Sequence, residues 1–174
     1  RYGCAFMGWN TKPDGSGDSY LDGDYITITG DITLYAQWHK TYILTFDKNN
    51  ENATGNDYSI VLLSGVSTAI PQDSFNNYLI EHYAIDQWNT ESNGSVIAYY
   101  ESQYITITED TTLYAQWVKT YDVTYVDYYG TNSNKVVTLK EGRIITAPTV
   151  PTKDGANFQH WTKSLYDPEV YNIS

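Results

Sequence analysis

The stretch DYITITGDITLYAQW at residues 24–38 returns as QYITITEDTTLYAQW at residues 103–117, and this duplication decides how the chain is organised. Trp38 and Trp117 stand 79 positions apart, as do Trp9 and Trp88. Self-similarity at a fixed period indicates an array of similar modules. The sequence therefore predicts tandem repeats with a period of about 79 residues.

The repeat boundary is predicted just after each Gln-Trp pair. The segments TYILTFD at residues 41–47 and TYDVTYVD at residues 120–127 open successive modules, again one period apart. One complete module is therefore expected at residues 40–118. Residues 1–39 form the C-terminal part of a preceding module, and residues 119–174 form the N-terminal part of a third.

The modules are predicted to be mainly β, or α+β at most. In residues 41–47, Tyr42, Leu44 and Phe46 occupy every second position and so share one face of a strand. Residues 59–63 are predicted to form a further strand. Only residues 73–81 have helical spacing, which predicts one short helix between the strand pairs.

The duplicated stretch itself predicts two strands. Residues 104–108 place Ile105 and Ile107 on one side, and residues 112–117 carry an apolar row at every second position. Glu109 and Asp110 lie between these strands as a short turn. Each module is therefore expected to close with a tight β-hairpin.

Composition limits the class of protein. Aromatic residues make up 16% of the 174 residues, which is too many for a disordered linker. The net charge of −11 disfavours nucleic acid and anionic membrane surfaces as partners. Cys4 is the only cysteine, so no intrachain disulfide forms. No apolar run reaches the roughly 18 residues of a membrane span, and the start at Arg1 indicates a processed product or part of a longer protein.

Several landmarks together resemble the Listeria–Bacteroides repeat, a module of listerial internalins and of many bacterial surface proteins. They are Gly3, Phe6, the run GWNT at residues 8–11, the polar residues 13–17 and TLYAQW at residues 33–38. The resemblance implies compact β-grasp-like modules in tandem on a secreted or cell-surface protein, where they act as a spacer or an interaction surface.

Later modules depart from this pattern. Residues 85–88 read IDQW in place of Phe-x-Gly-Trp, and His160 stands where the pattern has Gly. The spacing from Pro71 to Trp88 is also longer than the corresponding spacing in the third module. These departures argue against a ligand site shared by all modules.

No pattern indicates catalysis. His39, His82 and His160 lie in different modules or phases, and none has Cys or His at metal-ligand spacing. No nucleophile elbow, zinc-protease helix or phosphate-binding glycine loop occurs. The chain is predicted not to be an enzyme, with no catalytic, cofactor or metal residues and with ligand-binding residues unknown.

Two groups of residues leave a functional alternative open. The oxygen-rich loop carrying Asp14, Asp18, Asp22 and Asp24 is either a calcium site or a turn-rich loop, and it lacks EF-hand spacing. Most of these acids are absent one period later, which favours the turn-rich loop.

Trp9, Trp88 and Trp161 are either core residues or sugar-stacking platforms. Recurrence at a fixed phase beside Phe6, Ile85 and Phe158 favours the core. The pairs Tyr99-Tyr100 and Tyr128-Tyr129 are candidates for protein contacts or for partly buried positions between modules. Asn52, Asn93 and Asn172 match the glycosylation pattern without further support, and no Lys–Asn crosslink is assigned.

Three roles are compatible with these features. The first is a non-catalytic structural or spacer region of an extracellular, cell-surface protein, such as the stalk of an adhesin. The second is an adhesive module for a host protein or glycan. The third is an extracellular homo-polymer, in which the strands of residues 25–38 complete the third module of another copy by strand complementation. The expected partners of the first role are neighbouring modules.

Overall fold

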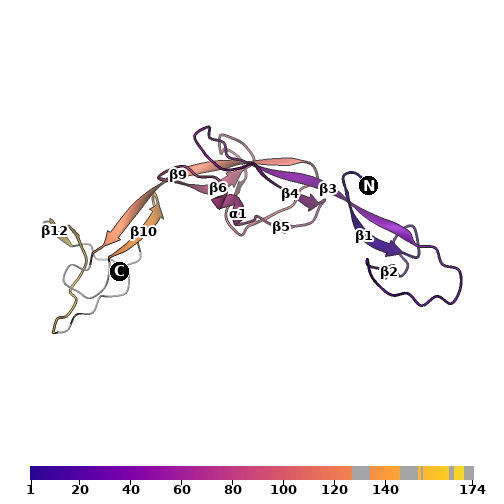
Figure 1. The fold of residues 1–174 in the computed structure, drawn as a ribbon. Coiled ribbons are helices and arrows are strands. Elements are labelled where there is room, and N and C mark those ends of the chain that lie inside the picture. The colour runs from indigo at the N-terminus through magenta and orange to yellow at the C-terminus, as the bar shows by residue number, and fades with distance from the viewer. Residues whose placement is uncertain (127–133, 146–152, 154, 165–166, 171–174) are drawn as a thin grey trace. The chain divides into compact units, whose positions relative to one another are not determined.

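The computed structural model describes residues 1–126, 134–145, 153, 155–164 and 167–170. The chain is mainly β, as predicted (Figure 1). The elements are β1 (Cys4–Asn10), β2 (Ser19–Tyr20), β3 (Tyr35–Asp47), β4 (Tyr58–Leu63), β5 (Thr68–Ala69), α1 (Asp73–Asn76), β6 (Tyr83–Asn89), β7 (Ala98–Tyr99), β8 (Tyr104–Ile105), β9 (Thr111–Tyr125), β10 (Lys135–Lys140), β11 (Thr162–Ser164) and β12 (Asp167–Val170).

Contacts divide the chain into two compact units. The first contains residues 1–80 and 85–117, and the second contains residues 81–84 and 118–174. Within the described residues, no helix is both long and apolar enough to span a bilayer.

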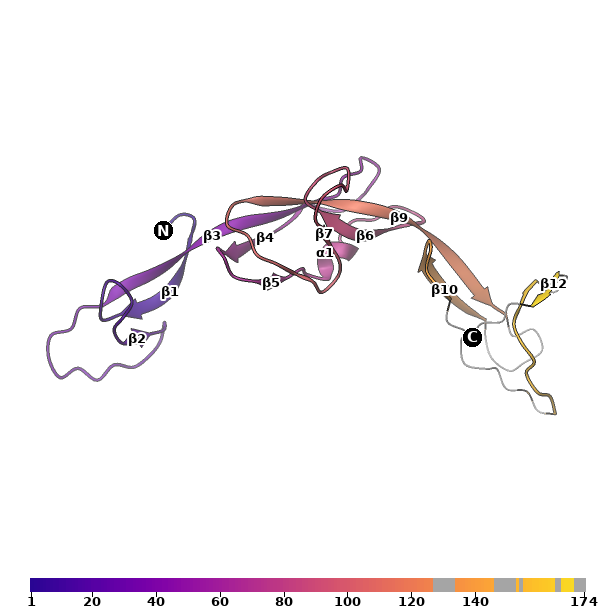
Figure 2. The ribbon, with the colours of Figure 1, turned by 180° about the vertical axis from the view of Figure 1, so that it is seen from behind.

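The middle repeat forms a mixed sheet in the order β4-β3-β9-β6. β3 pairs antiparallel with β4 and parallel with β9, with Leu44 opposite Thr111. The first and last strands of the repeat are thus parallel neighbours at the centre of the sheet, which is the arrangement of a β-grasp. Both views show α1 and β5 on the same face of this sheet (Figures 1 and 2).

One hydrophobic core lies under this sheet. Its fully buried members include Leu44, Phe46, Trp88 and Leu113, and the inward alternation predicted for residues 41–47 is confirmed. The rings of Phe46, Phe75 and Tyr78 each contact Trp88 edge-on. Every member of this core and every apolar residue packed against it lies between residues 42 and 117.

The predicted closing hairpin is wrong. β8 pairs with β5 in a separate two-stranded sheet, with Thr68 opposite Ile105, and β9 pairs with β3 and β6 instead. Because β9 lies between two strands, both of its hydrogen-bonding edges are filled. The alternation predicted for Ile105 and Ile107 is confirmed, since both side chains are buried in the core.

The helix is shorter than its pattern predicted, whereas the predicted strand at residues 59–63 is confirmed as β4. α1 covers only Asp73–Asn76. Phe75 packs against the core and Tyr78 is buried in it, but Leu79 is exposed and makes an isolated β-bridge with Thr54. The helix therefore ends before Tyr78 and Leu79, two apolar residues of the predicted helical pattern.

The first repeat is represented by β1, β2 and the first half of β3. β1 pairs antiparallel with β3 and with β2, and a β-bulge lies between Phe6 and Gly8. Gly8 has φ +125° and a Cβ there would lie 2.6 Å from the carbonyl oxygen of Tyr20, so this position requires glycine.

Successive repeats share a strand. Residues 35–40 of β3 pair with β1 of the first repeat, and residues 41–46 of the same strand pair with β4 of the middle repeat. β9 is built in the same way, since residues 111–114 pair with β3 and residues 120–125 pair with β10. No linker separates one repeat from the next at either place.

The second unit contains the β9–β10 pair and the short antiparallel pair of β11 and β12. Tyr125 is buried there, and its ring centroid lies 5.2 Å from that of Trp161. Phe158 packs at the same distance from Trp161. These three aromatic residues form a cluster among the described residues of this unit.

Candidate functional site

The loop that follows β1 is organised around a buried amide, Asn10. Its Nδ2 donates to the carbonyl oxygens of Gly15 and Gly17 and to Oγ of Ser19, at 2.9–3.1 Å. Its Oδ1 accepts hydrogen bonds from the backbone N–H groups of Lys12 and Gly17. One side chain thus satisfies five backbone or hydroxyl groups of a tight loop.

The same loop returns after β6, around Asn89. Oδ1 of Asn89 accepts from the N–H of Glu91 at 2.9 Å and from that of Val96 at a longer 3.4 Å. Nδ2 of Asn89 has no hydrogen-bond partner among the described residues, and Nε1 of the neighbouring Trp88 also has none. The second loop is therefore held less completely than the first.

Two sequence differences account for this contrast. Val96 occupies the position of Gly17, where a Cβ would lie 2.2 Å from Oγ1 of Thr11 and 2.8 Å from Oδ1 of Asn10. Ala98 occupies the position of Ser19 and has no hydroxyl. The added side chain displaces the loop from the asparagine, and the missing hydroxyl removes an acceptor.

Two of the four carboxylates of the candidate calcium loop cap turns. Asp14 accepts hydrogen bonds from the N–H and the hydroxyl of Ser16, and Asp24 accepts one from the N–H of Leu21. The bonds from Ser16 lower the pKa of Asp14, the backbone bond contributing most.

One repeat later, neutral amides make equivalent bonds. Asn93 accepts from the N–H of Ser95, and Gln103 accepts from the N–H of Tyr100. A carboxylate that an amide replaces without loss of the turn has a structural role. Across the described part of the chain, no three His, Cys, Asp or Glu residues gather as a metal site would require.

The histidines do not come together. Nε2 of His39 lies 2.9 Å from the carbonyl oxygen of Ser64, which joins β3 to the end of β4. His82 is exposed, and its Nε2 lies 3.5 Å from Oε1 of Glu81. His160 is exposed in the second unit.

The three recurrent tryptophans have different surroundings. Trp88 is fully buried, which confirms its prediction as a core residue. Trp9 is 40% exposed and contacts Phe6, and Phe6 in turn contacts Trp38. In both pairs the ring centroids are 5.4 Å apart. Trp161 is half-buried. Phe46 of the opening strand β3 packs against Trp88, and Tyr125 of the corresponding strand β9 packs against Trp161, whereas Trp9 contacts Phe6 of its own strand.

The tyrosine pairs and the asparagines of the glycosylation pattern differ in exposure. Tyr99 is half-buried in β7, Tyr100 is exposed, and Tyr128 and Tyr129 lie outside the described residues. Asn52 and Asn93 are exposed, whereas Asn172 lies outside the described residues.

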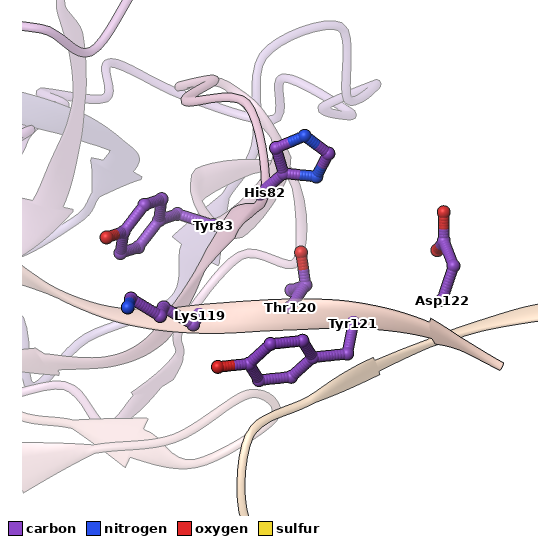
Figure 3. A pocket seen from close by; sticks show the side chains of 6 residues that line it. All are labelled: His82, Tyr83, Lys119, Thr120, Tyr121 and Asp122. Carbon is purple, nitrogen blue, oxygen red and sulfur yellow. The ribbon is translucent and has the colours of Figure 1, made fainter.

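One open hollow of about 400 Å³ occurs in the second unit (Figure 3). Its lining residues are His82, Tyr83, Lys119, Thr120, Tyr121 and Asp122. The side chains of Tyr83, Lys119 and Tyr121 extend in the same direction, and the N–H of Thr120 donates to the carbonyl oxygen of His82 at 2.8 Å.

Sequence patterns did not indicate this hollow, because its residues come from two separate segments. One period earlier the same positions are Gly3, Cys4, Lys40, Thr41, Tyr42 and Ile43. Only the Lys-Thr-Tyr run is repeated. The histidine, the first tyrosine and the aspartate are therefore particular to this place in the chain.

Comparison with known proteins assigns the chain to a family. The sequence family described as the Listeria–Bacteroides repeat domain matches residues 1–37, 42–116 and 121–172.

Two proteins of Evansella cellulosilytica are similar to the chain. One, named "Putative Gly-rich membrane protein", is 32% identical over 181 aligned residues that cover 99% of this chain and 21% of that protein. The other, named "Putative membrane protein", is 26% identical over 179 aligned residues, covering 99% of this chain and 24% of that protein. The chain thus spans less than a quarter of the length of these relatives, and no solved structure matches it.

Proposed function

The chain belongs to the Listeria–Bacteroides repeat family, and we propose that it is a structural spacer in a cell-surface protein. In this proposal residues 40–118 are one complete module between two partial ones. The observation that carries the proposal is the sharing of β3 and β9 between successive repeats, which leaves no flexible linker between them.

The parallel pairing of β3 with β9 supports a role in spanning distance. Parallel neighbours at the start and end of a repeat bring the chain in at one end of the sheet and out at the other. With Leu44 opposite Thr111, one period from Thr41 to Thr120 advances the chain by about twelve residue steps, roughly 40 Å at about 3.3 Å per residue. Each repeat would add about this length to a stalk.

Charge and chemistry agree with a spacer. The net charge of −11 keeps neighbouring copies apart and soluble. The described residues hold no group of three His, Cys, Asp or Glu that could bind a metal ion. We propose a non-catalytic role. The names of the relatives place them with membrane proteins, and in our proposal this segment lies outside the membrane, at the cell surface.

Insertion of an additional repeat tests the spacer role. A second copy of residues 41–119, inserted in frame after residue 119, preserves the phase of every strand. We expect the maximum dimension from small-angle X-ray scattering to increase by roughly 40 Å. An unchanged maximum dimension, with the added repeat folded, would contradict the proposal.

The adhesive and fibre roles stay predictions. Screens against glycans and host proteins test the first, and the elution volume of the concentrated chain tests the second. A monomeric elution profile would count against strand complementation.

A further inference from the structure

β4 forms one edge of the middle sheet, because among the described residues it pairs only with β3. Its sequence, YSIVLL, contains no charged residue and no proline. Natural edge strands normally carry charges, prolines or bulges that prevent pairing with another chain. β4 has none of these devices.

The free edge of β4 is defined by a hydrogen bond on the far side of β3. The N–H of Ile43 donates to Oδ1 of Asp110 at 2.8 Å, so it points away from β4. Ile43 lies opposite Val61, and in an antiparallel pair both residues of such a position turn their backbone groups outward. Val61, and Ser59 two residues earlier, therefore present their N–H and C=O groups to the edge.

A turn bounds this edge at its C-terminal end, where the carbonyl oxygen of Leu63 accepts from the N–H of Val66. The N–H of Tyr58 faces β3 instead, since it donates to the hydroxyl of Tyr78, which itself donates to the carbonyl oxygen of Phe46. The groups available for pairing are thus those between Tyr58 and Leu63. Four to five residues of an extended strand would match them.

The corresponding edge strand of the next repeat is protected. β10 reads KVVTLK, with Lys135 and Lys140 at its two ends. It occupies the same position on β9 as β4 does on β3. The contrast makes the uncharged edge a property of the middle repeat and not of every repeat.

Apolar side chains flank the edge on both faces of the sheet. Val61 is 67% exposed beside the exposed Ile43 on the outer face. Tyr58 and Ile60 are half-buried at the margin of the core on the inner face. An added strand would cover apolar surface on both faces, provided that its own residues at the edge are apolar or β-branched.

The net charge of the middle repeat favours a basic strand over a second copy of the chain at the edge of β4. Residues 41–119 carry ten acidic residues against Lys48 and Lys119, a net charge of −8. A second copy of the chain would bring a second module of −8 to the edge, whereas a basic strand is attracted to it. We propose that the edge of β4 binds an extended strand of another protein, with uncharged β-branched residues at its centre and Lys or Arg at its ends.

The test uses the whole chain and the peptide acetyl-KVTVTVK-amide, with acetyl-EVTVTVE-amide as the acidic control. We expect saturable binding of the basic peptide, with amide shifts in nuclear magnetic resonance spectra confined to β4 and its neighbours. Val61→Pro removes an N–H that faces the edge and no ladder bond of the sheet, so it should weaken binding at least tenfold while the chain stays folded.

The control is Val136→Pro on the edge of β10, at the position that corresponds to Ser59 of β4, which should leave binding unchanged. Four outcomes would overturn the proposal. They are no saturable binding up to about 1 mM peptide, equal binding by the folded Val61→Pro chain, equal binding of the acidic peptide, or self-association of the chain that Val61→Pro abolishes. The last outcome would identify a second copy as the occupant.

Discussion

Asn10 and Asn89 occupy the same position of the repeat, yet only Asn10 has all of its amide hydrogen bonds satisfied within the described residues. A buried amide without a partner loses its bonds to water and gains none in return. One part of the difference lies in the residue opposite each asparagine, which is Ser19 for Asn10 and Ala98 for Asn89.

Ala98→Ser is therefore expected to stabilise the chain. The new hydroxyl would accept a hydrogen bond from Nδ2 of Asn89, as Oγ of Ser19 does for Asn10. We expect a gain of about 1 kcal/mol in the free energy of unfolding, measured by urea denaturation. The matched variant Ser19→Ala should loosen the first loop. A loss of stability in Ala98→Ser would show that the loop cannot accept the hydroxyl.

The loop capped by Asp14 is expected to respond to acid. The bonds from Ser16 hold the pKa of Asp14 below its usual value of about 3.9, so the cap stabilises the loop above that pH and is lost as the pH falls through the lowered pKa. The amide resonance of Ser16 should shift in that acid range. The Ser95 amide, capped by the neutral Asn93, should not titrate with its cap, and equal titration of both amides would contradict this account.

Replacement of Trp88 and of Trp9 by alanine should lower the free energy of unfolding by different amounts, because the two side chains differ in burial. Trp88→Ala should cost about 3–5 kcal/mol in the free energy of unfolding, because the indole is fully buried among aromatic rings. Trp9→Ala should cost less than about 2 kcal/mol, since 40% of that residue remains exposed. Chemical denaturation measures both, and a cost below about 1 kcal/mol for Trp88→Ala would refute its place in the core.

At the scale of elements, the segment that crosses under the middle sheet has the largest difference from its sequence pattern. Residues 104–108 look like one arm of a hairpin, but the strand that would be the other arm, β9, already has a neighbour on each side. The segment therefore pairs briefly with β5 and contributes its isoleucines to the core from the opposite side.

The repeat supplies a matched test of this role. Ile107→Ala should cost about 2–5 kcal/mol, because Ile107 is 4% exposed and its removal leaves a cavity. Ile28 stands one period earlier and is 62% exposed, so Ile28→Ala should change stability by less than about 0.5 kcal/mol. Similar costs for the two variants would mean that Ile28 is also packed.

At the scale of the whole molecule, stability is expected to be uneven along the chain. β6 crosses a complete core, whereas in the described part of the chain β1 pairs with β2 and β3 and carries a partly exposed aromatic face. Amides of β1 should therefore exchange with deuterium faster than those of β6, although the two strands occupy the same position of the repeat. Hydrogen exchange followed by mass spectrometry measures this, and equal protection would show that the first repeat is as stable as the middle one.

The sequence by itself determined the period of 79 residues, the mainly β class, the inward faces of residues 41–47 and 112–117, and the family. These follow from residue identity and from alternation, which decides the face on which a side chain lies. Whether the repeat boundaries at residues 39–40 and 118–119 are also limits of folding stays a prediction.

Only the tertiary structure decided which strands pair, where a sheet ends, and which of two equivalent tryptophans is buried. A strand pattern does not specify its hydrogen-bonding neighbour, because backbone groups are the same in every residue and the partner depends on which edges are already filled. For this reason the hairpin expected at residues 104–117 is absent, and the uncharged edge of β4 could be located only in the assembled sheet. Trp9 and Trp88 likewise differ in burial through what packs against them and not through their own sequence.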